Sequence, residues 1–243
     1  MQMNEYEQRA FIEVEEWKRK LQKRSSILNR VSKKAQNKIN AYIPDKIQQT
    51  ITEAIKQMIQ ATLAGSNILK KKNLPRFHTL QGKDEELTKK IGQYKKIAVV
   101  EGAGTGAGGI LLGLADFPLL LSIKMNFLME TATIYGYDTD KLEERIYLLY
   151  IFQLAFSSEG KRREVLEVIE NWEQEKQKVA GLNWQELQQE YRDFIDFVKM
   201  LQLVPGIGAA VGAYANYNLL DQLGEAAKNV YRWRYFQEQK QLK

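Results

Sequence analysis

Three acidic residues beside apolar stretches are the side chains of this sequence best suited to chemistry: Asp116, Glu130 and Glu144. Carboxylates that meet in apolar surroundings acquire raised pKa values, and they can then act as general acids or bases or bind a hard cation through oxygen. They are our candidate catalytic residues if the chain is an enzyme. Simpler roles compete, because Asp116 is suited to cap a helix that enters at Pro118 and Glu144 to pair within the protein, beside Arg145.

Other site chemistries are restricted by composition. The 243 residues include no cysteine and a single histidine, His78, which lies in a basic stretch. Disulfides, thiolate sites and histidine-rich metal sites are therefore excluded within one chain, and a reducing compartment fits. We expect no metal and no cofactor, and we expect His78 at the surface.

Two apolar, glycine-containing segments stand out from a chain in which 27% of residues are charged. Residues 102–123 contain one charge, Asp116, and residues 200–220 contain none. Small residues four apart lie on one helical face, where two backbones can approach closely. We therefore predict two glycine-rich helices packed against each other, with these packing residues: Gly102, Gly106, Gly109, Gly113, Gly208 and Gly212.

The same segments admit two other interpretations. Residues 104–109 satisfy the G-x-G-x-x-G pattern of dinucleotide loops, but that loop needs flanking strands, and Pro118 interrupts the helix that should follow. Each segment is also about long enough to span a bilayer. Asp116 in the first segment and Asn216 in the second make spanning costly, so packed core helices or a re-entrant hairpin fit better.

The apolar periodicity predicts an all-α protein. Helices are expected at 4–24, 26–42, 45–64, 84–100, 116–135, 139–157, 159–180, 184–203 and 206–239, with a loop at 70–82. Gly65 and Gly136 are placed to end helices. We expect one multi-helix domain, in which basic amphipathic N-terminal helices (1–82) form one cooperative unit with a helical core (83–243).

Charge is distributed unevenly. The net charge is +6, yet residues 17–44 contain nine basic residues and no acid, so the remainder carries −3. A basic amphipathic stretch indicates an anionic membrane surface, while the acidic remainder argues against nucleic acid; a solvated helix face is the plainer interpretation. The candidate binding residues of this stretch are Lys18, Arg19, Lys23, Arg24, Arg30, Lys33, Lys34 and Lys38.

Polar residues near the C-terminus complete the candidate binding set. Asn216 and Tyr217 lie in an apolar helix and need hydrogen-bond partners if they are buried. Arg232 and Arg234, which flank Trp233, are typical of a helix end near lipid headgroups.

Two motifs resemble the EcsC protein family. The first is EGAGTGAGG followed by GLADFPLLL at 101–121, with YGYD at 135–138 and the pair Glu144 and Arg145; the second is the run at 204–236. The family is named for a gene beside two components of an ABC transport system, and it supplies no agreed catalytic set to carry over. A shared site would most plausibly use these motif residues: Asp116, Pro118, Tyr135, Gly136, Glu144, Arg145, Asn216 and Tyr217.

The resemblance and the charge pattern together predict a non-enzymatic accessory protein at the cytoplasmic membrane face. We expect it to be cytoplasmic and peripheral to the inner face of the plasma membrane, with anionic lipid or an ABC transporter as partner. A hydrolase acting on a lipid or peptide through clustered carboxylates is the first alternative, and a carrier of an apolar ligand is the second. The sequence leaves the oligomeric state open.

Overall fold

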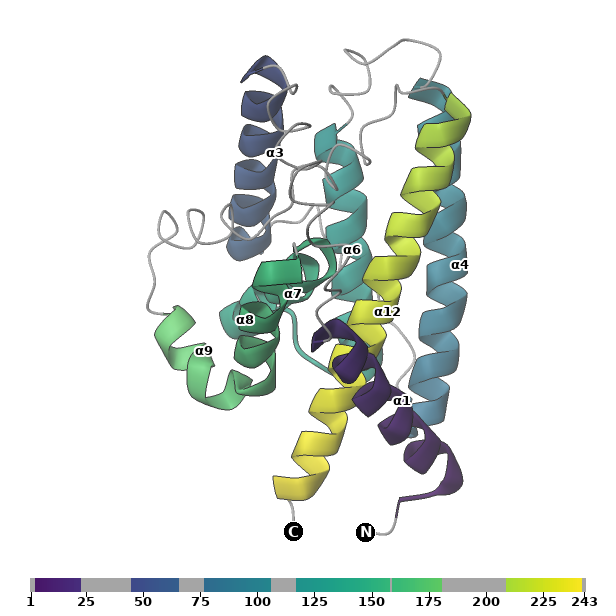
Figure 1. Cartoon of the computed structure of the whole chain (residues 1–243), viewed down its shortest axis with the longest axis vertical. Helices are drawn as coiled ribbons and strands as arrows, with labels where there is room; N and C mark the ends of the chain where they lie inside the picture. The colour runs from purple at the N-terminus through teal and green to yellow at the C-terminus, as the bar shows by residue number, and fades with distance from the viewer. Residues whose placement is uncertain are drawn as a thin grey trace.

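The computed structural model describes residues 3–22, 45–65, 77–105, 117–157, 159–180 and 209–241, and all structural statements refer to these. Their secondary-structure elements are eight α-helices, which confirms the all-α class (Figure 1). The helices are α1 (Glu5–Gln22), α3 (Asp45–Ala64), α4 (Leu80–Thr105), α6 (Phe117–Tyr135), α7 (Leu142–Phe156), α8 (Glu159–Glu170), α9 (Trp172–Ala180) and α12 (Ala209–Gln241).

Helices α6 and α7 form the centre of the core. Nearly every residue of α7 is buried, and α6 buries residues around most of its circumference. A helix that is apolar on all sides is stable only when other helices surround it. Helix α3 covers both with a stripe that includes Ile51, Ile55 and Ile59, and α12 packs against the same pair.

The long helices α4 and α12 lie side by side and run antiparallel (Figure 1). Contacts along their length fix the register: Asp84 of α4 pairs with Arg232, Ile91 lies against Gly224, and Lys95 pairs with Asp221. Helix α1 crosses the C-terminal half of α12, and the two chain ends emerge at the same end of the bundle (Figure 1). This end therefore brings together residues separated by more than two hundred positions.

Two helix boundaries differ from the prediction, one because a side chain caps the backbone and one because a backbone carbonyl accepts the first hydrogen bonds of a new helix. Helix α4 begins at Leu80, inside the predicted loop, since Thr79 Oγ1 accepts a hydrogen bond from the Gly82 amide at 3.1 Å. The proposed division after residue 82 thus falls in the first turn of α4, and the division itself stays a prediction. The predicted helix at 159–180 is interrupted at Asn171, whose carbonyl accepts from Gln174 and Glu175 as α9 starts.

The two predicted glycine stops are confirmed. Gly136 ends α6 with φ of 97°, and its amide and that of Tyr137 bond back to the carbonyls of Thr133 and Ala132. Gly65 ends α3 with φ of 64°. Both glycines adopt a left-handed conformation that a side chain would disfavour.

The glycine that sets the closest described helix contact is Gly224, which our packing prediction omits. A Cβ atom added there would lie 2.7 Å from Ile91 Cδ1, so α4 and α12 approach closely at this point. Gly102 and Gly212 fall within α4 and α12, but their packing lies outside the described part, as do Gly106, Gly109, Gly113 and Gly208 in full. Among the described residues, none of the helices is both long and apolar enough to cross a membrane.

Candidate functional site: a buried polar network at the α1–α12 crossing

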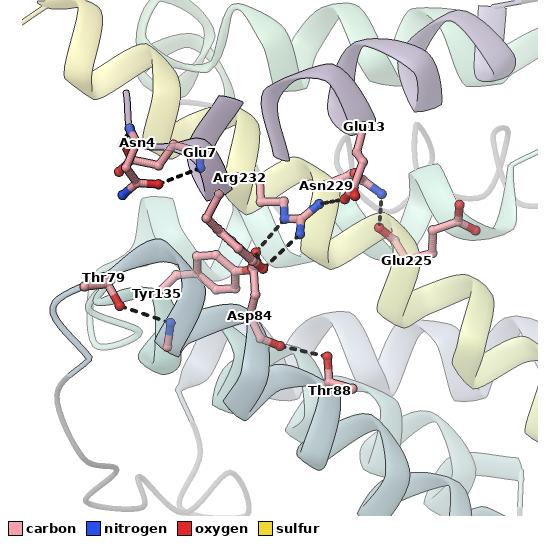
Figure 2. A network of polar contacts seen from close by, with 12 residues as sticks. Asn4, Glu7, Glu13, Thr79, Asp84, Thr88, Tyr135, Glu225, Asn229 and Arg232 are labelled. Carbon is pink, nitrogen blue, oxygen red and sulfur yellow. Dashed lines mark hydrogen bonds and ion pairs between the residues drawn. The ribbon is translucent and has the colours of Figure 1, made fainter. Parts of the chain in front are cut away.

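A buried carboxylate, Asp84, lies at the centre of a polar network where α1, α4, α6 and α12 meet. Its side chain is 1% exposed. It accepts hydrogen bonds from Arg232 Nε at 2.7 Å and from the Tyr135 hydroxyl (Figure 2). A third comes from Tyr6 Oη at 2.7 Å. A charge at this depth is tolerable only with such partners, because desolvation costs several kcal/mol.

Arg232 connects this carboxylate to the N-terminal helix. Its side chain is 4% exposed, and Nη1 donates to Glu13 Oε2 of α1 at 2.6 Å (Figure 2). Nη2 lies 3.3 Å from the Tyr6 hydroxyl. One guanidinium thus bridges α1 and α4 from α12. Burial lowers the pKa of Arg232, but the Asp84 charge and the hydrogen bonds to Glu13, Asp84 and Tyr6 together outweigh burial, and the net pKa is raised.

The phenols of this network remain protonated at neutral pH. Burial, followed by the hydrogen bond to Asp84, raises the pKa of Tyr6 to about 12. Burial and the Asp84 charge also raise the pKa of Tyr135 well above its usual value. Both hydroxyls therefore act as fixed donors to Asp84, and neither is prepared to act as a base.

A second buried ion pair lies two residues further along α12. Arg234 Nη1 donates to Glu144 Oε2 of α7 at 2.6 Å, and the Tyr231 hydroxyl donates to Glu144 Oε1 at 2.8 Å. Burial raises the pKa of Glu144, although Arg234 opposes this effect. Glu144 is thus held by the last helix, and the partner that our sequence argument considered, Arg145, donates to the carbonyls of Leu63, Thr139 and Asp140 instead.

Tyrosine rings fill the space between the two ion pairs. The Tyr231 ring stacks on those of Tyr135 and Tyr137, each at a centroid distance of 5.2 Å. The Arg234 guanidinium lies 3.9 Å from the centroid of Tyr137. Tyr135 and Tyr137 of the YGYD motif thus stack on Tyr231, whose hydroxyl bonds to the motif acid Glu144. The fold thereby brings these separate motif residues together.

Two half-buried lysines lie beside the network. Lys83 Nζ donates to the Tyr135 carbonyl at 2.7 Å, at the end of α6. Burial lowers the pKa of Lys83 and of Lys228, and in Lys228 the Arg232 charge adds to the effect. The two lysines add positive charge beside Asp84, the carboxylate that Arg232 already binds.

The predicted carboxylate candidates bind different cations. Glu130 lies 3.0 Å from Lys90 Nζ, whereas Glu144 is held by Arg234. Asp116, the third candidate, lies outside the described residues, as does its suggested role as a cap. In the described part of the chain no group of three or more His, Asp or Glu residues could hold a metal ion, and His78 is exposed as expected.

The predicted binding residues fall into three groups. Arg19 is exposed, whereas Lys18 lies 2.5 Å from Glu170 and 3.4 Å from the centre of the Trp233 ring. Arg232 and Arg234 lie inside the molecule in ion pairs, so we do not carry them into a lipid contact. The others lie outside the described residues or side chains: Lys23, Arg24, Arg30, Lys33, Lys34, Lys38, Asn216 and Tyr217.

Sequence reasoning missed Asp84, Tyr6 and Glu13. An acid at a predicted helix start is explained by its favourable interaction with the helix dipole, so nothing in the sequence indicated that Asp84 is a buried site residue. Tyr6 and Glu13 lie in a helix rich in acids, and only the crossing of α1 over α12 brings them to Arg232.

Fold and site together define a helical bundle in which two arginines of α12 bind buried carboxylates of α4 and α7, and one of them, Arg232, also binds Glu13 of α1. The chain belongs to the EcsC protein family, whose model matches residues 8–236. It is 51% identical over 223 residues to Protein EcsC of Bacillus subtilis (strain 168), covering 92% of this chain and 93% of that protein. It is 30% identical over 155 residues to Uncharacterized protein YdbA of the same organism, covering 62% and 57%. No solved structure matches the chain.

Proposed function

We propose that this protein is a non-enzymatic accessory protein that docks on the cytoplasmic face of the membrane through the basic stretch at 17–44. The observation that carries the proposal is the attachment of α1. Three of the nine basic residues of this acid-free stretch lie in this fixed helix, and the chain runs on from it into the other six. Each Lys or Arg near an anionic bilayer contributes about 1 kcal/mol of attraction. A cluster of this size is sufficient for reversible binding.

Polar and aromatic contacts fix α1 to the bundle. Tyr6 bonds to Asp84, Glu13 to Arg232 and Lys18 to Glu170 of α8. Phe11 packs edge-on against Phe236 at a centroid distance of 5.3 Å. A helix fixed at both ends gives the following stretch a defined starting point, so binding of lipid by that stretch would set the orientation of the whole bundle.

The state of the carboxylates favours this proposal over the hydrolase alternative. That alternative needs at least two of the three candidate acids in one pocket, free to exchange protons. Glu130 and Glu144 instead neutralise separate buried cations, Lys90 and Arg234. Breaking either pair would leave an uncompensated charge inside the protein and destabilise the fold. Both carboxylates therefore have a structural role.

The ABC transport partner implied by the family resemblance stays a prediction, as does the apolar-ligand carrier. Purification of the tagged protein from native membranes, with mass spectrometry of the bound proteins and lipids, tests both. Specific recovery of transporter subunits would support an ABC transporter as the partner. Recovery of a stoichiometric apolar molecule without membrane would instead support the carrier.

The docking proposal is tested by vesicle flotation with charge-matched variants. We expect wild-type protein to float with vesicles that contain phosphatidylglycerol at low salt, and Lys33→Gln/Lys34→Gln/Lys38→Gln to bind at least about tenfold more weakly. The control removes the same charge from exposed helix positions: Lys89→Gln/Lys96→Gln/Lys178→Gln. We expect this control to retain most of the binding.

Equal losses in both triple variants would reduce the effect to net charge and contradict a specific role of the stretch. Absence of wild-type binding at low salt would contradict the proposal as a whole.

A further inference from the structure

A small cavity lies where α7, the first turn of α9 and α12 meet. Its volume is about 90 Å³, which is larger than one water molecule needs. Its walls include Tyr147 of α7, Trp172 at the start of α9, and Trp233 and Arg234 of α12. It lies on the far side of Arg234 from the Asp84 network, and none of the functions argued above uses it.

Three hydrogen-bond donors in these walls have no acceptor. They are Tyr147 Oη, Trp233 Nε1 and Arg234 Nε, all buried and without a hydrogen-bond partner in the described part of the protein. Arg234 Nε comes no closer than 3.7 Å to Glu238 Oε1. A buried unsatisfied donor costs about 1–3 kcal/mol, so three around one cavity call for a common explanation.

These groups remain donors throughout the physiological pH range. Burial raises the pKa of Tyr147, which keeps the phenol protonated. Burial lowers the pKa of Arg234, but the Glu144 charge and the neighbouring tyrosines together outweigh burial, so the net pKa is raised and the guanidinium stays charged. A ligand that satisfies them must therefore present acceptor oxygens.

The remaining wall residues disfavour an anion. Glu170, Glu173 and Glu238 line the same cavity, whereas Arg234 is its lining cation and already neutralises Glu144. Lys18 and Lys176 offset two of these carboxylates, at 2.5 Å from Glu170 and Glu173 respectively. The lining thus offers bare donors beside acceptors, a combination that matches hydroxyl groups, which accept and donate at once.

We propose that this cavity binds a neutral polyhydroxyl group of about the size of glycerol. Its hydroxyl oxygens accept from Tyr147, Trp233 and Arg234, and its hydroxyl protons are donated to carboxylates such as Glu238. The indole walls of Trp172 and Trp233 cover its apolar carbon atoms. A free polyol and the glycerol headgroup of a lipid share this chemistry. The site does not depend on the basic stretch.

The indole proton of Trp233 reports directly on the site. In ¹H–¹⁵N spectra the four tryptophans give separate indole signals, and Trp233→Phe assigns the relevant one. We expect glycerol to shift the Trp233 signal saturably while that of Trp17, which does not line the cavity, stays in place. Tyr147→Phe, which keeps the ring and removes one donor, should weaken binding about fivefold.

Two comparisons make the outcome decisive even if Tyr147→Phe folds poorly. Glu238→Gln changes a half-exposed side chain and should weaken glycerol binding a few-fold, because a charged acceptor is lost. Sodium acetate should leave the Trp233 signal unchanged. The proposal is overturned if acetate produces the saturable shift, if Glu238→Gln strengthens binding, or if all indole signals drift linearly with glycerol, which would indicate a cavity that holds water only.

Lipid bicelles identify the source of the group. A shift of the Trp233 signal with phosphatidylglycerol but not with phosphatidylserine, at equal surface charge, points to the lipid headgroup. A shift with free glycerol alone points to a free polyol. The triple variant at Lys33, Lys34 and Lys38 should keep the glycerol response even when vesicle binding is lost, so failure of the docking proposal and failure of this site are distinguishable.

Discussion

At the scale of single residues, Arg232 and Arg234 join α12 to neighbouring helices through ion pairs inside the molecule. Each binds a buried carboxylate, Asp84 in one case and Glu144 in the other, and each carboxylate also accepts a phenolic hydrogen bond. Arg232 adds an exposed partner, Glu13, whose side chain is 61% exposed. Because burial makes a charge expensive to leave alone, the buried partners should dominate the stability of this region.

Replacement of Asp84 tests whether the buried partner of Arg232 contributes more to stability than the exposed partner, Glu13. We expect Asp84→Asn to lower the free energy of unfolding by about 3 kcal/mol, since Arg232 would keep only its exposed partner. Glu13→Gln removes that exposed partner and should cost less than about 1 kcal/mol. Guanidinium chloride denaturation of both variants measures the difference. Similar losses in the two variants would show that burial does not decide the strength of the pair.

Glu144 gives a pH dependence with a definite sign. Burial raises its pKa in the folded state above the ordinary value of 4.5, although Arg234 opposes the shift. Its contribution to stability is therefore fully present below 4.5 and is lost as pH rises through the raised pKa. Wild type should lose stability relative to Glu144→Gln as the pH increases from about 4.5 to 7.

Denaturation of wild type and variant at several pH values measures this difference, with the exposed neighbour variant Glu143→Gln as control. A stability advantage of wild type that grows with pH would mean that Arg234 dominates over burial and would refute the assigned direction.

At the scale of elements, the antiparallel helices α4 and α12 form the most extensive described helix pair of the bundle, and α1 packs across both. The two helices approach closely at Gly224, where the Ile91 side chain occupies the space that a Cβ atom would need. The contact lies between the Asp84–Arg232 and Lys95–Asp221 pairs, nearer to the second. Packing and ion pairs thus fix the same register.

A methyl group at Gly224 should disturb this packing measurably. We expect Gly224→Ala to lower the midpoint of thermal unfolding, with an overpacking cost of about 1–2 kcal/mol reduced by any gain in helix propensity. Ile91→Val, which removes the Cδ1 atom at 2.7 Å, should recover part of the loss in the double variant. Additive destabilisation by the two changes would contradict direct contact as the cause.

Within the described residues the sequence predicted the elements well, because apolar periodicity and glycine stops are local signals; the predicted helices at 26–42 and 184–203 lie outside those residues. Helix ends at Gly65 and Gly136 follow from residues within a turn of them. Thr79 and Asn171 were missed as caps because Gly82 resembles a loop residue and the apolar pattern continues through Asn171. The network around Asp84 could not be predicted, because it depends on which helices cross.

At the scale of the whole molecule, the contacts that attach α1 and most of the basic charge lie in different parts of the chain. Tyr6 and Glu13 hold α1 to Asp84 and Arg232, and the basic stretch begins in the last residues of α1 and continues beyond them. The sequence predicts Arg232 and Arg234, on either side of Trp233, near lipid headgroups, whereas the fold pairs both of them internally. The proposed docking therefore rests on the cations at 17–44 rather than on the C-terminal helix.

The absence of cysteine from this chain allows the docking surface to be located directly. An environment-sensitive dye is attached to Ser32→Cys in the basic stretch and, as a control, to Gln93→Cys on the exposed side of α4. With phosphatidylglycerol vesicles at low salt, we predict a blue shift of the dye at position 32 that high salt reverses, and no change at position 93. Equal shifts at both positions, or a shift at position 93 alone, would contradict docking through the basic stretch.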